Sequence, residues 1–138
     1  MTAFAIATVS AYIGGHLVSG ERVGVDHARD TALPGVFTPV MLAADLPDNT
    51  PTPVDLDGTP LVVVRREDQA FALAATCAHL GGPLADGTLD GDSIICPWHG
   101  SRFSLTDGRV LDGPSAFAQP CLTARIRDGQ VEVRGGCW

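Results

Sequence analysis

The sequence predicts an all-β fold, a sandwich of small antiparallel sheets preceded by a short N-terminal helix or apolar leader. From residue 36 onward the apolar segments are short and rich in Val, Leu and Ile, and Gly or Pro interrupts them at close intervals. Asp-Gly pairs separate several of these segments, and this dipeptide is a strong signal for a β-hairpin. With 138 residues, the chain can bury the modest core of one domain.

The strands are expected to pair as hairpins in three small antiparallel sheets. Asp-Gly pairs mark turns at 57–58, 90–91, 107–108 and 128–129, and residues 45–53 form a proline-rich loop. In the last hairpin residue 127 faces residue 130, so Cys121 lies opposite residue 136. The expected strands span residues 36–42, 53–56, 61–65, 70–75, 87–89, 93–95, 102–105, 109–111, 122–127 and 130–134.

The N-terminal segment, residues 2–18, is uncharged and too apolar for an ordinary linker. A bilayer span needs about 20 apolar residues, so its length is marginal, and it contains two glycines and His16. One interpretation is a soluble helix; the other, which we favour, is a membrane-derived segment. By the positive-inside rule, Arg22 and Arg29 would then keep the following domain cytoplasmic, at the inner face of the membrane. Residues 1–35 are thus expected to form this segment and a connector, and residues 36–138 the domain.

The charge pattern argues against nucleic-acid binding. The chain has nine arginines, no lysine and sixteen carboxylates, for a formal charge of −7. A negative charge of this size would steer the protein toward a basic face on a partner. Acidity for solubility alone is the alternative explanation.

Two short motifs in the second half of the chain carry metal-binding residue types. Cys77 and His79 are one residue apart, and Cys96 and His99 are two residues apart. In an extended loop, residues i and i+2 point the same way, so the first pair can face one centre. In the second motif, a tight turn started by Pro97 aims the pair inward.

Glycines accompany both motifs. Gly81, Gly82 and Gly100 let the backbone curl closely around a site, with amide N–H groups free to point at sulfur. Two thiolates and two imidazoles fit either a tetrahedral structural zinc or a two-iron centre in which His replaces Cys on one iron. Common zinc patterns pair Cys with Cys and His with His, whereas here each motif is mixed, which favours the two-iron centre.

These motifs resemble those of the Rieske iron–sulfur proteins, in their ferredoxin-like branch, and the resemblance covers roughly residues 36–134. It implies a Rieske-type sandwich with the cluster loops at one tip and one [2Fe–2S] cluster per chain. It also implies that Cys77 and Cys96 bind the inner iron and that His79 and His99 bind the outer one. The N-terminal segment is similar to the last helix of a membrane domain that is fused ahead of some bacterial Rieske modules.

The resemblance also assigns roles around the cluster. Gly82 and Trp98 stand where other family members carry two cysteines of a disulfide clamp, which points away from the high-potential respiratory subunits. Ser101 matches a serine that hydrogen-bonds a bridging sulfide, while Phe103 replaces a tyrosine and offers no hydroxyl. We therefore expect an intermediate to low potential within the Rieske range of about −150 to +300 mV. Pro114 matches the proline loop that covers the third side of the cluster.

The function implied is one-electron transfer by a ferredoxin-type component, with a flavin reductase and a terminal oxygenase or other oxidoreductase as partners. Oxygenase catalysis in this chain is not expected, because a mononuclear iron needs two His and a carboxylate. Only His16 and His27 remain for it, and both lie within residues 1–35, away from any catalytic domain. Alternatives are a structural zinc domain, a regulatory sensor, and an accessory domain of a membrane-associated oxidoreductase.

The remaining cysteines are Cys121 and Cys137. Their positions on the last hairpin allow a disulfide. Two free thiols are nevertheless expected, because a reducing cytosol keeps cysteines reduced.

Overall fold

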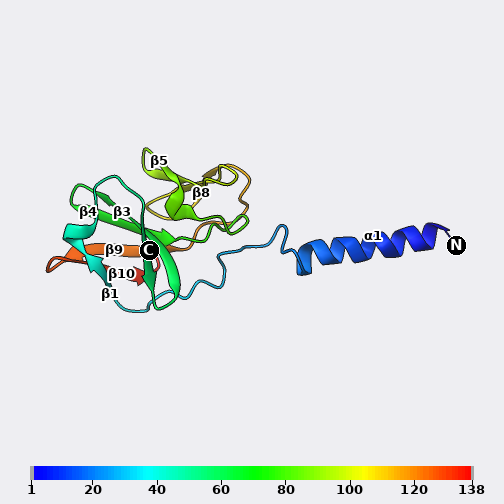
Figure 1. The fold of residues 1–138 in the computed structure, drawn as a ribbon, viewed down its shortest axis with the longest axis horizontal. Coiled ribbons are helices and arrows are strands. Elements are labelled where there is room, and N and C mark those ends of the chain that lie inside the picture. The colour runs from blue at the N-terminus through cyan, green and yellow to red at the C-terminus, as the bar shows by residue number, and fades with distance from the viewer. Residues whose placement is uncertain (1, 138) are drawn as a thin grey trace.

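The computed structural model describes residues 2–137 as one helix, ten strands and two short 3₁₀ helices (Figure 1). The elements are α1 (Thr2–Ser19), β1 (Thr38–Leu42), η1 (Ala43–Asp45), β2 (Thr52–Leu56), β3 (Thr59–Arg66), β4 (Gln69–Ala74), η2 (Leu84–Asp86), β5 (Thr88–Asp90), β6 (Ser93–Ile95), β7 (Arg102–Ser104), β8 (Val110–Asp112), β9 (Cys121–Arg127) and β10 (Gln130–Gly135). The all-β prediction is confirmed, and each expected strand is present within two residues of its predicted bounds.

The strands form two antiparallel sheets rather than three. The larger has the order β1-β10-β9-β4-β3-β2, and the smaller has the order β5-β6-β7-β8. The prediction of three sheets is wrong because β4 pairs with β9. The pairing is short and consists of Ala72 with Leu122 and Leu73 with Cys121. This short pairing joins two three-stranded halves, and local hairpin signals do not report a contact between strands so far apart in the chain.

Strand β3 explains how the two sheets share a core. Its four consecutive residues Leu61–Val64 are buried, which indicates a strand covered on both faces. Side chains alternate along a strand. Leu61 and Val63 therefore pack against other side chains of the larger sheet, while Val62 and Val64 face the smaller sheet. Val62 and Val64 share a cluster of buried side chains with Ile94 of the smaller sheet. The small sheet is therefore packed against the large one.

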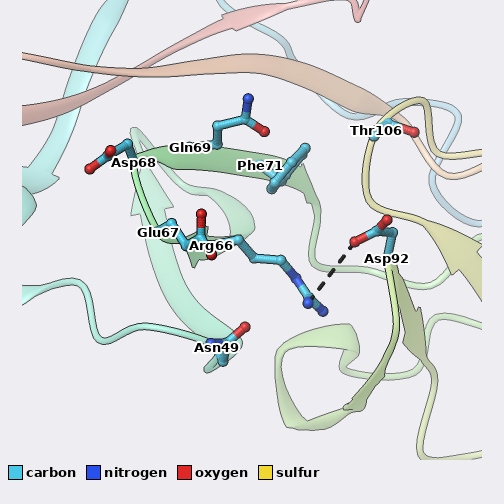
Figure 2. A pocket seen from close by; sticks show the side chains of 8 residues that line it. All are labelled: Asn49, Arg66, Glu67, Asp68, Gln69, Phe71, Asp92 and Thr106. Atoms are coloured by element: carbon cyan, nitrogen blue, oxygen red, sulfur yellow. Dashed lines mark ion pairs between the residues drawn. The ribbon is translucent and has the colours of Figure 1, made fainter.

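A hollow at the edge of the domain lies between the β3–β4 turn and the β5–β6 turn (Figure 2). The Arg66 guanidinium crosses it, donates a hydrogen bond to the carbonyl of Gly91 and lies 4.0 Å from the Asp92 carboxylate. These contacts fasten the turn of the small sheet to β3. The residues lining the hollow are Asn49, Arg66, Glu67, Asp68, Gln69, Phe71, Asp92 and Thr106.

Helix α1 stands apart from the strands at one end of the molecule (Figure 1). All of its residues are exposed, and its mean hydropathy is 1.3 over eighteen residues. By length and composition α1 could cross a membrane. For one helix near the N-terminus, these two properties are weak evidence of a membrane span. Its exposed large apolar side chains are Phe4, Ile6, Val9, Tyr12, Ile13, Leu17 and Val18.

The connector between α1 and β1 contacts the domain at two places. At its far end, the Gly135 N–H donates to the carbonyl of Pro34 (2.7 Å). Nearer α1, Ala28 is buried and the backbone N–H of His27 donates to the carbonyl of Ala78 (3.1 Å). Because Ala78 lies between Cys77 and His79, this part of the connector lies beside the first metal-binding motif.

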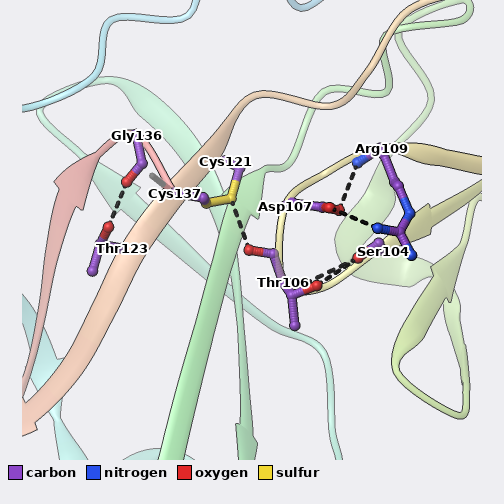
Figure 3. The surroundings of a disulfide bond; sticks show 8 residues. All are labelled: Ser104, Thr106, Asp107, Arg109, Cys121, Thr123, Gly136 and Cys137. Carbon is purple, nitrogen blue, oxygen red and sulfur yellow. Dashed lines mark hydrogen bonds and ion pairs between the residues drawn. A yellow bond between two sulfur atoms is a disulfide. The ribbon is translucent and has the colours of Figure 1, made fainter.

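The last hairpin carries a disulfide between Cys121 and Cys137 (Figure 3). Arg127 faces Gln130, as expected, and the Cα atoms of the two cysteines are 5.6 Å apart. The expectation of two free thiols is thus contradicted by the structure. The bond fixes the C-terminal end of the chain to the first residue of β9, where the Thr123 hydroxyl also donates to the carbonyl of Gly136 (2.5 Å).

Candidate metal centre

The two motifs fold into two loops, and each loop is closed by two backbone hydrogen bonds in the same arrangement. In the first loop, the Cys77 N–H donates to the carbonyl of Gly82 and the Gly81 N–H donates to the carbonyl of Cys77, both at 2.8 Å. In the second, the Cys96 N–H donates to the carbonyl of Ser101 (2.9 Å) and the Gly100 N–H to that of Cys96 (3.1 Å). Each loop therefore begins and ends at equivalent positions.

Both loops are tight turns. Gly81 and Gly100 have the same φ of +75°, a conformation in which a side chain would be strained. The turn that we predicted after Pro97 is present. The extended first loop that we predicted is wrong, because Ala78–Leu80 form a turn closed by the bond between Gly81 and Cys77.

The two thiols lie at the end of the core that the sheets share. Cys77 is 1% exposed, Cys96 is 2% exposed, and neither belongs to a disulfide. Burial, reinforced by the neighbouring Cys96 thiol, raises the pKa of Cys77 to about 11, although nearby backbone N–H groups act to lower it. A metal that binds this sulfur must therefore displace a proton.

The two imidazoles lie together and closer to solvent. The ring centroids of His79 and His99 are 5.0 Å apart, with the rings nearly perpendicular. His99 is exposed and His79 is half-buried. Burial, His99 and His27 together hold the pKa of His79 below its usual range, which favours the neutral, metal-binding form. The Nδ1 atom of His79 is buried and has no hydrogen-bond partner among the described residues.

Trp98 and Gly82 connect the two loops. A Cβ atom at Gly82 would lie 3.0 Å from the Cys96 sulfur and 3.1 Å from the Trp98 ring, so the tryptophan packs directly over this glycine. Trp98 is still 57% exposed, and its outer face is therefore free for contact with another molecule. These two residues occupy the positions where the family resemblance placed a disulfide clamp.

The second loop is supported by the segment that contains Pro114. A Cβ atom at Gly113 would lie 2.7 Å from the Cα of Ser101, and the Ser115 N–H donates to the Ser101 hydroxyl (3.2 Å). Ser101 is fully buried, and because its oxygen accepts this bond, its own proton is available for another acceptor. Pro114 itself is exposed.

Two residues that hold the first loop in place were missed by sequence reasoning. Gln119 is 2% exposed and hydrogen-bonds the backbone of the first loop, and His27 contacts the same loop from the connector. An isolated Gln before Pro carries no sequence signal for a contact with this loop.

Phe103, which is fully buried, packs in the same core cluster as both cysteines.

A family model for the Rieske [2Fe-2S] domain matches residues 36–123. The chain belongs to the Rieske [2Fe–2S] family. It is 35% identical over 101 residues to ferredoxin CarAc of Metapseudomonas resinovorans, which covers 72% of this chain and 94% of that protein. Its cofactor is accordingly a [2Fe–2S] cluster, and the zinc alternative is not supported.

Other Rieske proteins extend the comparison. A solved complex of oxygenase and ferredoxin in carbazole 1,9a-dioxygenase contains a chain with a TM-score of 0.67 and 34% identity; the match covers 73% of our chain and 94% of that one. The oxygenase component of 3-ketosteroid-9-alpha-monooxygenase from Mycolicibacterium smegmatis is 36% identical over 124 residues. The match covers 84% of our chain and 31% of that oxygenase.

The donor set fits the cluster. The structure provides two buried thiols that are not oxidised, a neighbouring pair of imidazoles, and an unpartnered buried Nδ1 atom. Thiolate and imidazole are the ligand types of a Rieske centre.

Proposed function

We propose that this Rieske protein is a one-electron carrier of the ferredoxin type, with Cys77, His79, Cys96 and His99 as the cluster ligands. The observation that supports this assignment best is the paired geometry: two buried thiols lie on two loops closed in the same way, and the two imidazoles from those loops are 5.0 Å apart. When bound, the cluster supplies one-electron oxidation and reduction. Residues 36–138 form the electron-transfer domain in this proposal.

The surrounding residues have separate roles in the proposal. Trp98 and Gly82 exclude water from the Cys96 side of the centre, and the segment at Pro114 covers the second loop. Ser101 donates a hydrogen bond to a cluster sulfide, while Phe103 contributes packing alone. With one such donor in place of two, the potential lies in the middle to lower part of the Rieske range.

The imidazoles form the route for the electron. Neutral imidazole binds metal through one nitrogen and keeps the other available to a partner or to water. His99 is exposed, so an electron can leave through it over a short distance. The proposed partners are a flavin reductase as donor and a terminal oxygenase or other oxidoreductase as acceptor. The solved complex of an oxygenase with a ferredoxin supports the oxygenase as acceptor. The charge of −7 would favour a basic docking face on these partners.

The test is a visible absorption and electron paramagnetic resonance (EPR) spectrum of the purified protein before and after dithionite. A brown protein that bleaches and gives the low-average-g signal of a mixed Cys/His cluster is expected. A colourless, EPR-silent protein that contains one zinc ion would refute the proposal.

The reduction potential is expected to fall as pH rises. Each ligand imidazole keeps a proton on its free nitrogen, and the more positive oxidised centre holds that proton less tightly. Above the pKa of the oxidised form, deprotonation stabilises that form, so the potential falls by about 59 mV per pH unit for one proton per electron. Voltammetry from neutral to alkaline pH would measure this slope. A flat profile would contradict histidine ligation.

We also infer that α1 attaches the carrier to the inner face of the membrane; the ferredoxin relatives themselves favour only a cytoplasmic location. The observation that favours attachment is the distribution of exposed apolar side chains. Phe4, Val9, Ile13 and Val18 project around the helix rather than along one stripe, which is typical of a helix surrounded by apolar material. At 1.5 Å per residue the helix is about 27 Å long, close to the thickness of a bilayer core.

Flotation of the full chain with lipid vesicles tests the attachment. The wild-type protein is expected to float with the vesicles, whereas the double variant Val9→Asp/Ile13→Asp should lose roughly nine-tenths of its binding, since each charge in a bilayer costs about 3 kcal/mol. Val36→Asp is the matched control, because Val36 is 72% exposed but lies outside the helix. Equal flotation of all three proteins, or none by the wild type, would refute the attachment.

A further inference from the structure

Gln119 is buried at the point where the core of the domain meets the first metal-binding loop. It lies between β8 and β9 and is 2% exposed. Its backbone N–H donates to the carbonyl of Gly108 (2.8 Å), and a Cβ atom at Gly108 would overlap the Gln119 carbonyl oxygen. The main chain of this residue is therefore fixed by close packing.

The side-chain amide makes three hydrogen bonds to the backbone on either side of Cys77. Its Oε1 accepts from the N–H of Ala78 (2.9 Å), and its Nε2 donates to the carbonyls of Ala74 (2.7 Å) and Thr76 (2.7 Å). The reversed amide would set its NH₂ group against an N–H and its oxygen against two carbonyls. The partners thus define the orientation of the amide.

The three hydrogen bonds of the Gln119 side chain begin where the backbone pairing between β4 and β9 ends. Strand β4 stops at Ala74, whose N–H donates to the carbonyl of Pro120 (2.8 Å) as the last backbone link toward β9. Beyond that point the chain turns into the first loop, and the Gln119 side chain takes over as the bonding partner. The bonds to Ala74 and Ala78 are buried, where an unpaired backbone group costs about 1–3 kcal/mol, and the bond to Thr76 is half-buried.

Ala78 is the residue between the two proposed ligands, Cys77 and His79. It is fully buried, its N–H is held by Gln119, and its carbonyl accepts from the N–H of His27. Both backbone groups of this residue are therefore held from outside the loop. Fixing the Cys77–Ala78 peptide also fixes the direction in which the cysteine and the histidine leave the backbone.

We propose that Gln119 is a positioning residue for the cluster: its amide sets the geometry of Cys77 and His79 toward iron. This inference rests on the ligand assignment of the proposed function. It assigns the residue an effect on the electronic properties and the retention of the cluster, beyond any effect on the stability of the fold. Hydrogen-bonded residues behind metal ligands typically affect metal affinity by about 10–100-fold.

Two substitutions separate these effects. Gln119→Leu keeps roughly the same volume but removes all three hydrogen bonds. Gln119→Glu keeps the acceptor for Ala78 and places a carboxylate oxygen against two carbonyls. The matched controls are Gln69→Leu and Gln69→Glu, because Gln69 is exposed at the start of β4.

The experiment compares holoproteins by EPR, by reduction potential, and by the rate at which the cluster is lost to an iron chelator. Both Gln119 variants are expected to lose the cluster roughly tenfold faster than the wild type and the controls, with shifted EPR lines. If Gln119→Leu does not fold, Gln119→Glu decides. Wild-type EPR lines, potential and cluster lifetime in the folded variants would overturn the proposal, even with a lower melting temperature. A wild-type protein without the EPR signal would instead refute the ligand assignment itself.

Discussion

Replacing either proposed histidine ligand, His79 or His99, by alanine is expected to reduce the iron content of the purified protein at least tenfold. In the proposed assignment, each substitution would remove one of the two nitrogen donors to the cluster. The Nδ1 atom of His79 has no other hydrogen-bond partner among the described residues, so loss of this ring removes a donor without disturbing a protein network. Iron analysis and the visible spectrum would measure the effect.

The controls for this experiment are the two remaining histidines. His16 lies on α1, where its ring pairs with the exposed Glu21 at 3.3 Å, so His16→Ala should leave the spectrum unchanged. His27→Ala tests a closer position. The bond from His27 to Ala78 comes from the backbone N–H and survives the substitution, so this variant should also keep its cluster. Full iron content in His79→Ala or His99→Ala would contradict the assignment.

The strands and the metal-binding residue types could be predicted because their signals are local. Hairpin turns such as Asp128-Gly129 have positive φ at both residues, which is what the Asp-Gly sequence favours. The apolar run within residues 61–65 likewise indicated a strand, and the structure has β3 there. Cys and His in two mixed motifs were sufficient to indicate a two-iron centre, and the family comparison confirmed that cofactor.

The features that were missed depend on contacts between residues distant in sequence. Gln119 reaches Ala78 across 41 residues, and the β4–β9 pairing that merges the sheets joins residues about as far apart. A Gln before a Pro carries no periodicity or spacing that would reveal its partner. The shape of the first loop also depends on closure between Cys77 and Gly81, which the Cys-x-His spacing does not specify.

The largest effect on stability is expected from removing the disulfide. The Cys121–Cys137 bond joins residues separated by 16 positions, and a bond closing a loop of this size stabilises a fold by about 3 kcal/mol. The double variant Cys121→Ser/Cys137→Ser should therefore lower the free energy of unfolding in urea by that amount. Its visible spectrum should be unchanged, because Cys77 and Cys96 are the proposed cluster ligands.

Chemical reduction of the wild-type protein provides the matching comparison. A phosphine reductant should lower the stability of the wild type to that of the double variant. The same reductant should not change the stability of the double variant, which has no Cys121–Cys137 bond to cleave. Cys121 starts β9, the strand that immediately follows Gln119 and Pro120, so the bond anchors the segment that supports the first loop. We therefore expect the double variant to release its cluster as it unfolds, at a lower urea concentration than the wild type. Equal urea midpoints for oxidised, reduced and substituted proteins would show that the bond does not stabilise the fold.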